Sequence, residues 1–305
     1  MQRRHTMKKN SILSIFILFV TAIVWGLAFP FQNIASEYLS AFWFNGIRFL
    51  LGALSLVPVV LIFEREKISK AQWKKTLLAS AVCGTILFAA SALQQIGISM
   101  SGSSAKAAFI TGLYMIFVPF CGIFLKKKIR MEAWLGAGAA VIGLYFVCFS
   151  NGIQSAHIGD LVVLIGALCW TAHILCIDKF ASECPSLKFS LFQFIFCGIL
   201  NLAVAPILDG PLNVAPEVFT GALLPILYCG ICSVGVAYTC QVIGQRGTEP
   251  ALASIILCTE SIFAALGEPL IDKSATPLPP LGYMGCALIF AGILLSQSKI
   301  FKKKA

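Results

Sequence analysis

Long runs of apolar residues alternate along this chain with short polar stretches. A transmembrane helix needs about 20 consecutive, mostly apolar residues. Ten stretches meet that requirement: 12–32, 41–63, 76–98, 103–125, 132–150, 159–177, 187–208, 217–243, 250–268 and 280–298. Little of the chain remains for a soluble domain. The pattern therefore predicts an all-α integral membrane protein with ten transmembrane helices.

The first apolar run follows the basic stretch MQRRHTMKKN, as the core of a signal peptide would. The run is longer than such a core, and no small-x-small cleavage motif ends it. We interpret residues 12–32 as a retained helix.

Composition and charge agree with a membrane location. Of the 305 residues, 58% are hydrophobic and only 12% are charged, although the net charge is +10. With the amino terminus inside, the loops of one side carry Arg3, Arg4, Lys8, Lys9, Arg65, Lys67, Lys70, Lys74, Lys75, Lys126, Lys127, Lys128, Arg130, Lys179, Lys188, Arg246, Lys299, Lys302, Lys303 and Lys304. The other side has Lys273 alone. This positive-inside bias predicts a multi-pass protein of the cell membrane with both termini cytoplasmic. The basic loops are then expected to lie near the head groups of the lipid bilayer, and nucleic-acid binding is not expected.

The twelve cysteines are scattered through the apolar spans, where cysteine behaves as a small hydrophobic residue. One close pair, Cys229 and Cys232, has no second pair or histidine at metal-ligand spacing. We therefore expect packing cysteines and neither a metal nor another cofactor.

The chain contains a weak internal repeat. Trp25 aligns with Trp170, Gln94 with Gln241, and GAGAAVIG from Gly136 with GCALIFAG from Gly285. The offsets of 145, 147 and 149 residues drift slowly over the whole chain, which implies two halves, 1–150 and 151–305, of five spans each. Because five is odd, the halves enter the membrane from opposite sides. Inverted repeats around a central cavity are the recurrent plan of secondary transporters.

The sequence resembles the EamA-type transporters of the drug/metabolite transporter superfamily over essentially its whole length. The resemblance is carried by AIVWGLAFPF, IRFLLGAL, SSAKAAFITGLYMIFVP and TEPALASIILCTESIFAALGE in the first, second, fourth and ninth spans. It implies an exporter or exchanger of small metabolites with a cavity lined by both halves. The long, proline-rich connection GEPLIDKSATPLPPLG between the last two spans departs from the first-half turn LKKKIRMEAWLG.

Ionisable residues inside a membrane span are functional candidates. Arg48 and Lys106 lie about two turns and one turn into their spans, counted from the outer side, and predict a shared cationic vestibule for a carboxylate or phosphate. Snorkelling to the interface, or ion pairing within the bundle, is the structural alternative. Glu260 lies near mid-membrane and either carries a coupling proton, pairs with Lys106, or holds helices together.

Other polar and aromatic residues complete the expected substrate site. Gln94, Gln241 and Gln193, which aligns with Arg48, are candidate cavity residues, with interhelical hydrogen bonding as the alternative. His173 is a candidate proton carrier. Trp25, Trp170 and Tyr114 are candidate cavity walls, although aromatic residues at helical spacing more often pack. Kinks are expected at Pro30, Pro119 and Pro225.

These features predict a secondary transporter of small metabolites, such as amino acids or other carboxylate-bearing compounds, and not an enzyme. An integral membrane enzyme would need clustered acids or histidines, which the sequence lacks. A small-solute channel is the other alternative. Substrate, direction, proton coupling and assembly as a homodimer stay open at this level.

Overall fold

The computed structural model describes residues 11–101, 104–124, 131–149, 157–213, 215–272 and 279–302, and every element in these ranges is a helix. The first half contributes α1 (Ile12–Ala35), α2 (Ala41–Phe63), α3 (Lys70–Ser101), α4 (Ser104–Gly112), α5 (Tyr114–Phe124) and α6 (Met131–Phe149). The second half contributes α7 (Ile158–Phe180), α8 (Ser186–Leu208), α9 (Pro216–Leu227), the π-helix η1 (Tyr228–Tyr238), α10 (Thr239–Gln245), α11 (Pro250–Leu257), α12 (Glu260–Ile271) and α13 (Pro280–Lys302). The ten predicted apolar spans all coincide with helical segments.

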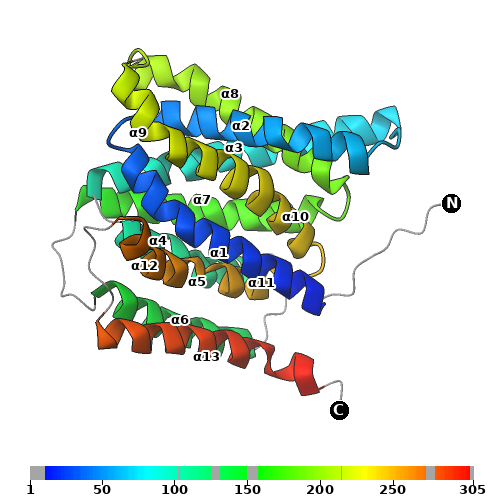
Figure 1. Ribbon diagram of the computed structural model, residues 1–305. Coiled ribbons are helices and arrows are strands. Elements are labelled where there is room, and N and C mark those ends of the chain that lie inside the picture. Colours follow the sequence, from blue (N-terminus) through cyan, green and yellow to red (C-terminus); the bar gives the residue numbers. More distant parts are fainter. Residues whose placement is uncertain are drawn as a thin grey trace.

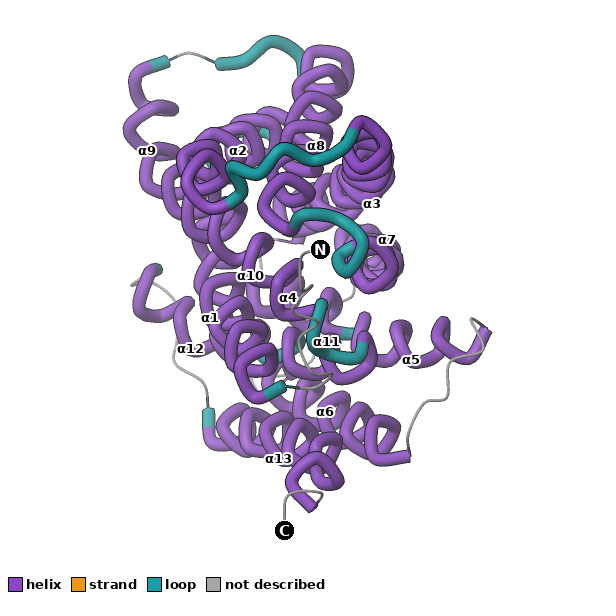
Figure 2. The backbone as a smooth tube through the Cα atoms, turned by 90° about the vertical axis from the view of Figure 1, so that its right-hand side faces the viewer, coloured by secondary structure: helices purple, strands orange, loops and turns teal. Residues whose placement is uncertain are grey.

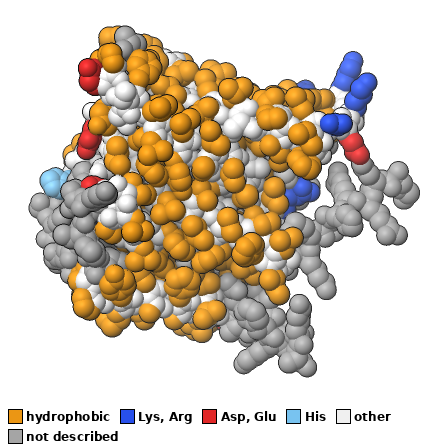
Figure 3. Space-filling model, viewed as in Figure 1, with side chains coloured by type: hydrophobic (Ala, Val, Ile, Leu, Met, Phe, Trp, Pro, Cys, Tyr) orange, Lys and Arg blue, Asp and Glu red, His pale blue; other side chains and the backbone are white. Residues whose placement is uncertain are grey.

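By length and apolar composition, eight continuous or nearly continuous helical segments among the described residues can cross a membrane. They are Ile12–Ala35, Ala41–Phe63, Lys70–Met100, Ser104–Ile123, Ile158–Phe180, Ser186–Leu208, Pro216–Gln245 and Pro250–Ile271. Two shorter apolar stretches, Trp134–Gly143 and Pro280–Leu295, lie within α6 and α13. Large apolar side chains such as Leu54, Phe63 and Leu270 are exposed. Hydrophobic side chains cover most of the face in Figure 3. This surface suits lipid, and the chain is a multi-pass membrane protein.

The helices form three layers. In Figures 1 and 2, α6 and α13 pack together on one side of the bundle, and α2, α3, α8 and α9 lie on the opposite side. The middle layer contains α1, α4, α7, α10, α11 and α12. This arrangement surrounds α1 and α7 with helices from both halves.

The two ends of the bundle differ in charge. Helix α1 begins and α13 ends at the right-hand end in Figure 1, where Lys and Arg side chains also gather in Figure 3. Part of the predicted basic set lies outside the described residues: Arg3, Arg4, Lys8, Lys9, Lys126, Lys127, Lys128, Arg130, Lys273, Lys303 and Lys304. The middle of the proline-rich stretch that departs from the family pattern, residues 273–278, also lies outside them.

Helices α6 and α13 meet through glycines that the repeat alignment pairs. A Cβ atom added to Gly143 would lie 2.5 Å from the backbone oxygen of Gly285, and one added to Gly292 would lie 2.6 Å from that of Gly136. Small residues allow such close approach between membrane helices. Each helix therefore uses the same two aligned positions against the other.

A second pair of contacts is related in the same way. A Cβ atom on Gly97 in α3 would lie 2.8 Å from the backbone oxygen of Gly159 in α7, and one on Gly244 in α10 would lie 3.2 Å from that of Ser14 in α1. Gly97 aligns with Gly244 at an offset of 147 residues, and Ser14 with Gly159 at 145. The repeat detected in the sequence thus reappears as matched helix contacts.

Two spans are interrupted near their middles. One turn at Leu113 separates α4 from α5, and Cys258 and Thr259 separate α11 from α12. Neither break contains a proline, whereas Pro30, Pro119 and Pro225 lie inside α1, α5 and α9. The breaks place Tyr114 and Glu260 at the first positions of two facing half-helices.

The cysteines whose side chains are described are free thiols. Cys83 of α3 and Cys176 of α7 are far apart in the sequence, but the structure brings their sulfur atoms within 2.9 Å of each other. Cys229 packs in η1, where its sulfur lies 3.9 Å from the Ala28 carbonyl of α1. In the described ranges, no group of three or more His, Cys, Asp or Glu side chains is placed to hold a metal ion.

Candidate functional site

A small cavity lies in the middle of the bundle, where helices of both halves meet. Its volume is about 30 Å³, which is room for roughly two water molecules. It is lined by Trp25, Ala28, Phe29, Gln32, Arg48, Gln94, Thr111, Tyr114, Trp170, Ile174, Ser233, Tyr238, Gln241 and Glu260. A cavity lined by apolar walls and a few convergent polar groups is the usual form of a small-molecule site.

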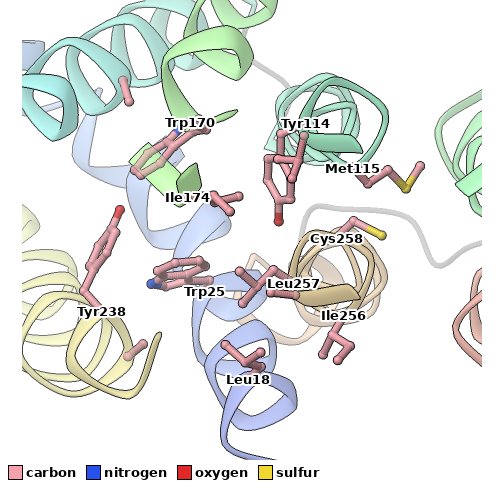
Figure 4. Packing of buried hydrophobic residues seen from close by; sticks show 14 of the residues in the cluster. Leu18, Trp25, Tyr114, Met115, Trp170, Ile174, Tyr238, Ile256, Leu257 and Cys258 are labelled. Carbon is pink, nitrogen blue, oxygen red and sulfur yellow. The ribbon is translucent and has the colours of Figure 1, made fainter. Parts of the chain in front are cut away.

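Aromatic rings from four elements form much of the wall. Trp25, Tyr114, Trp170 and Tyr238 come from α1, α5, α7 and η1, and Figure 4 shows them around one shared space. The ring centroids of Trp25 and Trp170, which the repeat alignment pairs, are 6.4 Å apart. Tyr238 lies 4.6 Å from Trp25 and stacks on Trp170 at 5.9 Å.

Arg48 supplies a buried positive charge. Its side chain is 2% exposed and lies near the rings of Phe44 and Phe49, at 5.1 and 5.2 Å from their centroids. Nε donates to Asn45 Oδ1 at 2.9 Å, and Nη1 donates to Gln32 Oε1 at 3.1 Å. Nη2 has no hydrogen-bond partner. No carboxylate among the described residues pairs with this guanidinium, so the cavity wall carries a cation without a protein counter-ion.

Glu260 supplies a buried carboxyl group in the same cavity. The hydroxyl of Tyr114 donates to its Oε1 at 2.9 Å. The two residues begin α5 and α12, so this hydrogen bond joins the two broken spans directly. The cavity therefore presents a guanidinium from α2 and a carboxyl group from α12.

Further polar atoms around the cavity are only partly satisfied. Gln94 Nε2 donates to Thr111 Oγ1 at 3.1 Å. Trp170 Nε1 and Gln241 Oε1 are buried without a hydrogen-bond partner. A buried polar atom without a partner is unfavourable, and these two atoms are therefore available to a ligand.

The structure brings together six of the nine residues predicted for the site: Arg48, Gln94, Tyr114, Trp170, Gln241 and Glu260 all line the cavity. Sequence reasoning missed Gln32, Thr111, Ser233 and Tyr238 as lining residues. Gln32 is an amide inside an apolar run and could have been noticed. The other three side chains are common in membrane helices and carry little signal of their own.

His173 and Gln193 lie outside this lining and contact each other. His173 Nε2 is 3.2 Å from Gln193 Oε1. The imidazole packs edge-on against Trp170 and Tyr238, with centroid distances of 5.8 and 6.3 Å. The pair thus supports two aromatic walls from behind.

Lys106 also lies outside the lining, and the predicted shared vestibule with Arg48 is divided in the structure. Lys106 Nζ lies 2.6 Å from Asp160 Oδ2, at the start of α7. Of the three interpretations predicted for Glu260, pairing with Lys106 is not the arrangement formed, because Glu260 bonds Tyr114 and Lys106 bonds Asp160.

The fold and the cavity together define a class of protein: a multi-pass helical bundle with a polar, aromatic-walled chamber at its centre. The EamA-like transporter family model matches the chain twice, over residues 12–149 and 157–297. This chain belongs to that family, and it is a membrane transporter.

Similar proteins have transporter names without an assigned substrate. An uncharacterized transporter of Archaeoglobus fulgidus is 25% identical over 284 residues, covering 93% of this chain and 85% of the relative. The uncharacterized transporter YyaM of Bacillus subtilis is 23% identical over 301 residues, covering 94% and 95%. A solved crystal structure with 17% identity aligns at a TM-score of 0.74 over 96% of this chain and 99% of the other, which is a likeness of fold alone.

Proposed function

We propose that this transporter moves small carboxylate-bearing metabolites, with amino acids as the first candidates, across the cell membrane as an exporter or exchanger. The observation that carries the proposal is Arg48, a buried cation on the cavity wall with one nitrogen unbonded and no ion pair to a carboxylate of the described residues. A guanidinium binds a carboxylate through two parallel hydrogen bonds. A carboxylate substrate would supply the missing counter-ion.

Amino acids fit better than simple carboxylates because the cavity also offers groups for an ammonium. Glu260 and the unbonded Gln241 Oε1 are acceptors on the same lining. Trp25, Trp170 and Tyr238 provide apolar and aromatic surface for a side chain. Glu260 is also the residue we propose for any coupled proton.

The small volume of the cavity supports alternating access. About 30 Å³ is too little for an amino acid, so the helices must separate to admit one. A substrate can cross in this way without a pore that is open to both sides at once. Alternating exposure of one central site is the general mechanism of transporters built from repeats.

We further propose ten membrane spans arranged as two inverted repeats, 1–150 and 151–305. The double match of the family model, the matched glycine contacts and the two facing breaks support this arrangement. Helices α6 and α13 count as spans in this proposal although their apolar stretches are the shortest.

Reporter fusions test the topology. A fusion at Lys127 and one at the carboxyl terminus are expected to read cytoplasmic, and one between 151 and 157 external, because the basic loop residues then lie inside. A cytoplasmic reading between 151 and 157 would contradict the inverted arrangement. The basic residue Arg65, in the first inner loop, provides the internal reference.

Counterflow in proteoliposomes tests the function. Vesicles loaded with unlabelled amino acid should accumulate labelled amino acid transiently and saturably, whereas empty vesicles should not. Organic acids, nucleosides and cationic dyes serve as competitors. Saturable counterflow of dyes alone would overturn the carboxylate proposal, and flux that neither saturates nor shows counterflow would indicate a channel.

A further inference from the structure

The first two turns of α4 close one end of the cavity by polar contacts with two other helices. Lys106 pairs with Asp160 at the start of α7. Ser104 Oγ donates to Glu268 of α12, and Ser261 Oγ of α12 donates to the Ala108 carbonyl at 2.8 Å. The helix α4 belongs to the first half of the chain, and both of its partners belong to the second.

These contacts lie directly beyond the cavity. Thr111 lines the cavity from α4, and Lys106 stands five residues before it on the same helix. Glu260 lines the cavity from α12, and Glu268 stands eight residues after it, toward the same end. By the proposed topology this end is the external one.

The opposite side of the cavity is closed differently. Leu18 stands seven residues before Trp25 on α1, and Ile256 stands four residues before Glu260 along the same span, so both lie toward the inner end. They are buried with Leu252 in one apolar cluster, and Figure 4 shows Leu18 and Ile256 below the ring of Trp25. Apolar packing is non-directional, whereas an ion pair has one defined partner. A charged substrate can therefore compete for the outer closure in a way that it cannot for the inner one.

We propose that the Lys106–Asp160 ion pair is the latch of an external gate, a statement that rests on the proposed transport function. The side chains of Lys106 and Asp160 are 11% and 15% exposed, so solvent and salt screen the pair only weakly. A substrate carboxylate that moves outward from the cavity takes the place of Asp160 beside Lys106. The pair then separates and α4 moves away from α7.

Asp160 keeps another hydrogen-bond partner when the latch opens. Its Oδ2 also accepts the backbone N–H of His157 at 2.8 Å. The carboxylate stands in the first turn of α7, where the helix dipole favours a negative charge. The latch therefore opens without leaving Asp160 unpartnered, and Asp160 is a positioning residue, not a substrate ligand.

Site-resolved thiol labelling tests the gate without requiring a known substrate. Thr111→Cys places a reporter in the cavity, and a membrane-impermeant thiol reagent is applied from one side at a time to vesicles of known orientation. Peptide mass spectrometry separates labelling at residue 111 from that of the native cysteines. With the latch intact, external labelling should be slow.

Lys106→Gln and Asp160→Asn, each combined with the reporter, should raise the external labelling rate about tenfold, as expected if the pair favours closure by about 1.4 kcal/mol. The asparagine keeps an acceptor for the His157 N–H. Both substitutions together should label no faster than either alone, because one contact is removed in all three cases. Lys75→Gln, which breaks the surface pair with Glu183, should leave the rate unchanged.

Unchanged labelling in both single variants, or effects that add in the double variant, would overturn the gate. Lys106→Arg provides a folded, charged variant in which slow labelling should persist. A failure of the transport proposal looks different: counterflow of carboxylates would be absent while the latch variants still changed labelling.

Discussion

Arg48→Lys is expected to lower counterflow of carboxylate substrates at least about 30-fold, which corresponds to about 2 kcal/mol of lost interaction. Lysine keeps the positive charge but lacks the planar guanidinium group. In Arg48 this group donates hydrogen bonds to Asn45 and Gln32 and still has Nη2 without a partner. The measurement is the initial rate of counterflow at a substrate concentration below saturation.

Folding is separable from function in this experiment. Lysine keeps the positive charge and a similar apolar stem at this position, so monodisperse, folded protein should still be obtained. Arg65→Gln is the matched control, because Arg65 is an exposed arginine bonded to the Leu61 carbonyl. The Arg48→Lys substitution should lower counterflow of an amidated substrate analogue less than it lowers counterflow of the free acid. Equal losses for acid and amide would contradict carboxylate recognition by Arg48.

Glu260→Gln is expected to have the second large effect, a loss of amino-acid counterflow of at least about 30-fold. The amide can still accept the Tyr114 hydrogen bond but carries no charge for an ammonium or a proton. Counterflow of hydroxy acids, which lack the ammonium, should fall much less. Any dependence of transport on an imposed proton gradient should disappear with the carboxyl group. The folded yield should hold, because Lys106 is neutralised by Asp160.

Tyr114→Phe isolates the hydrogen bond across the two breaks. Removing the donor leaves a buried acceptor unsatisfied, which costs about 1–3 kcal/mol, so counterflow should fall roughly fivefold or more. In the Glu260→Gln background the same substitution should add little, since the two side chains act through one contact. Fully additive losses would mean that Tyr114 acts on substrate independently of Glu260.

Much of the architecture is readable from the apolar pattern. In lipid, a backbone must satisfy its hydrogen bonds internally, and a helix does so within one continuous segment. The run 41–63 accordingly coincides with α2, and 187–208 with α8 apart from one residue. The aligned pairs Trp25 with Trp170 and Gln94 with Gln241 were visible in the sequence, and each pair lines the cavity.

The pattern says less about which way a polar residue faces. Arg48 and Gln193 occupy aligned positions, yet Arg48 lines the cavity and Gln193 bonds His173 behind Trp170. The rotation of each helix is set by close contacts such as Gly46 against Leu202 and Gly198 against Leu50. Those contacts join segments about 150 residues apart, and local periodicity does not contain them.

The sequence by itself determined the membrane class, the helical spans, the repeat and most of the residues that could form a site, because lipid imposes those constraints segment by segment. The tertiary structure decided that Lys106 meets Asp160, that Glu260 meets Tyr114, and that the spans break at Leu113 and Cys258 without a proline. The physical reason is that a buried charge takes the partner that helix packing brings within reach, and packing depends on side-chain shape across the whole bundle.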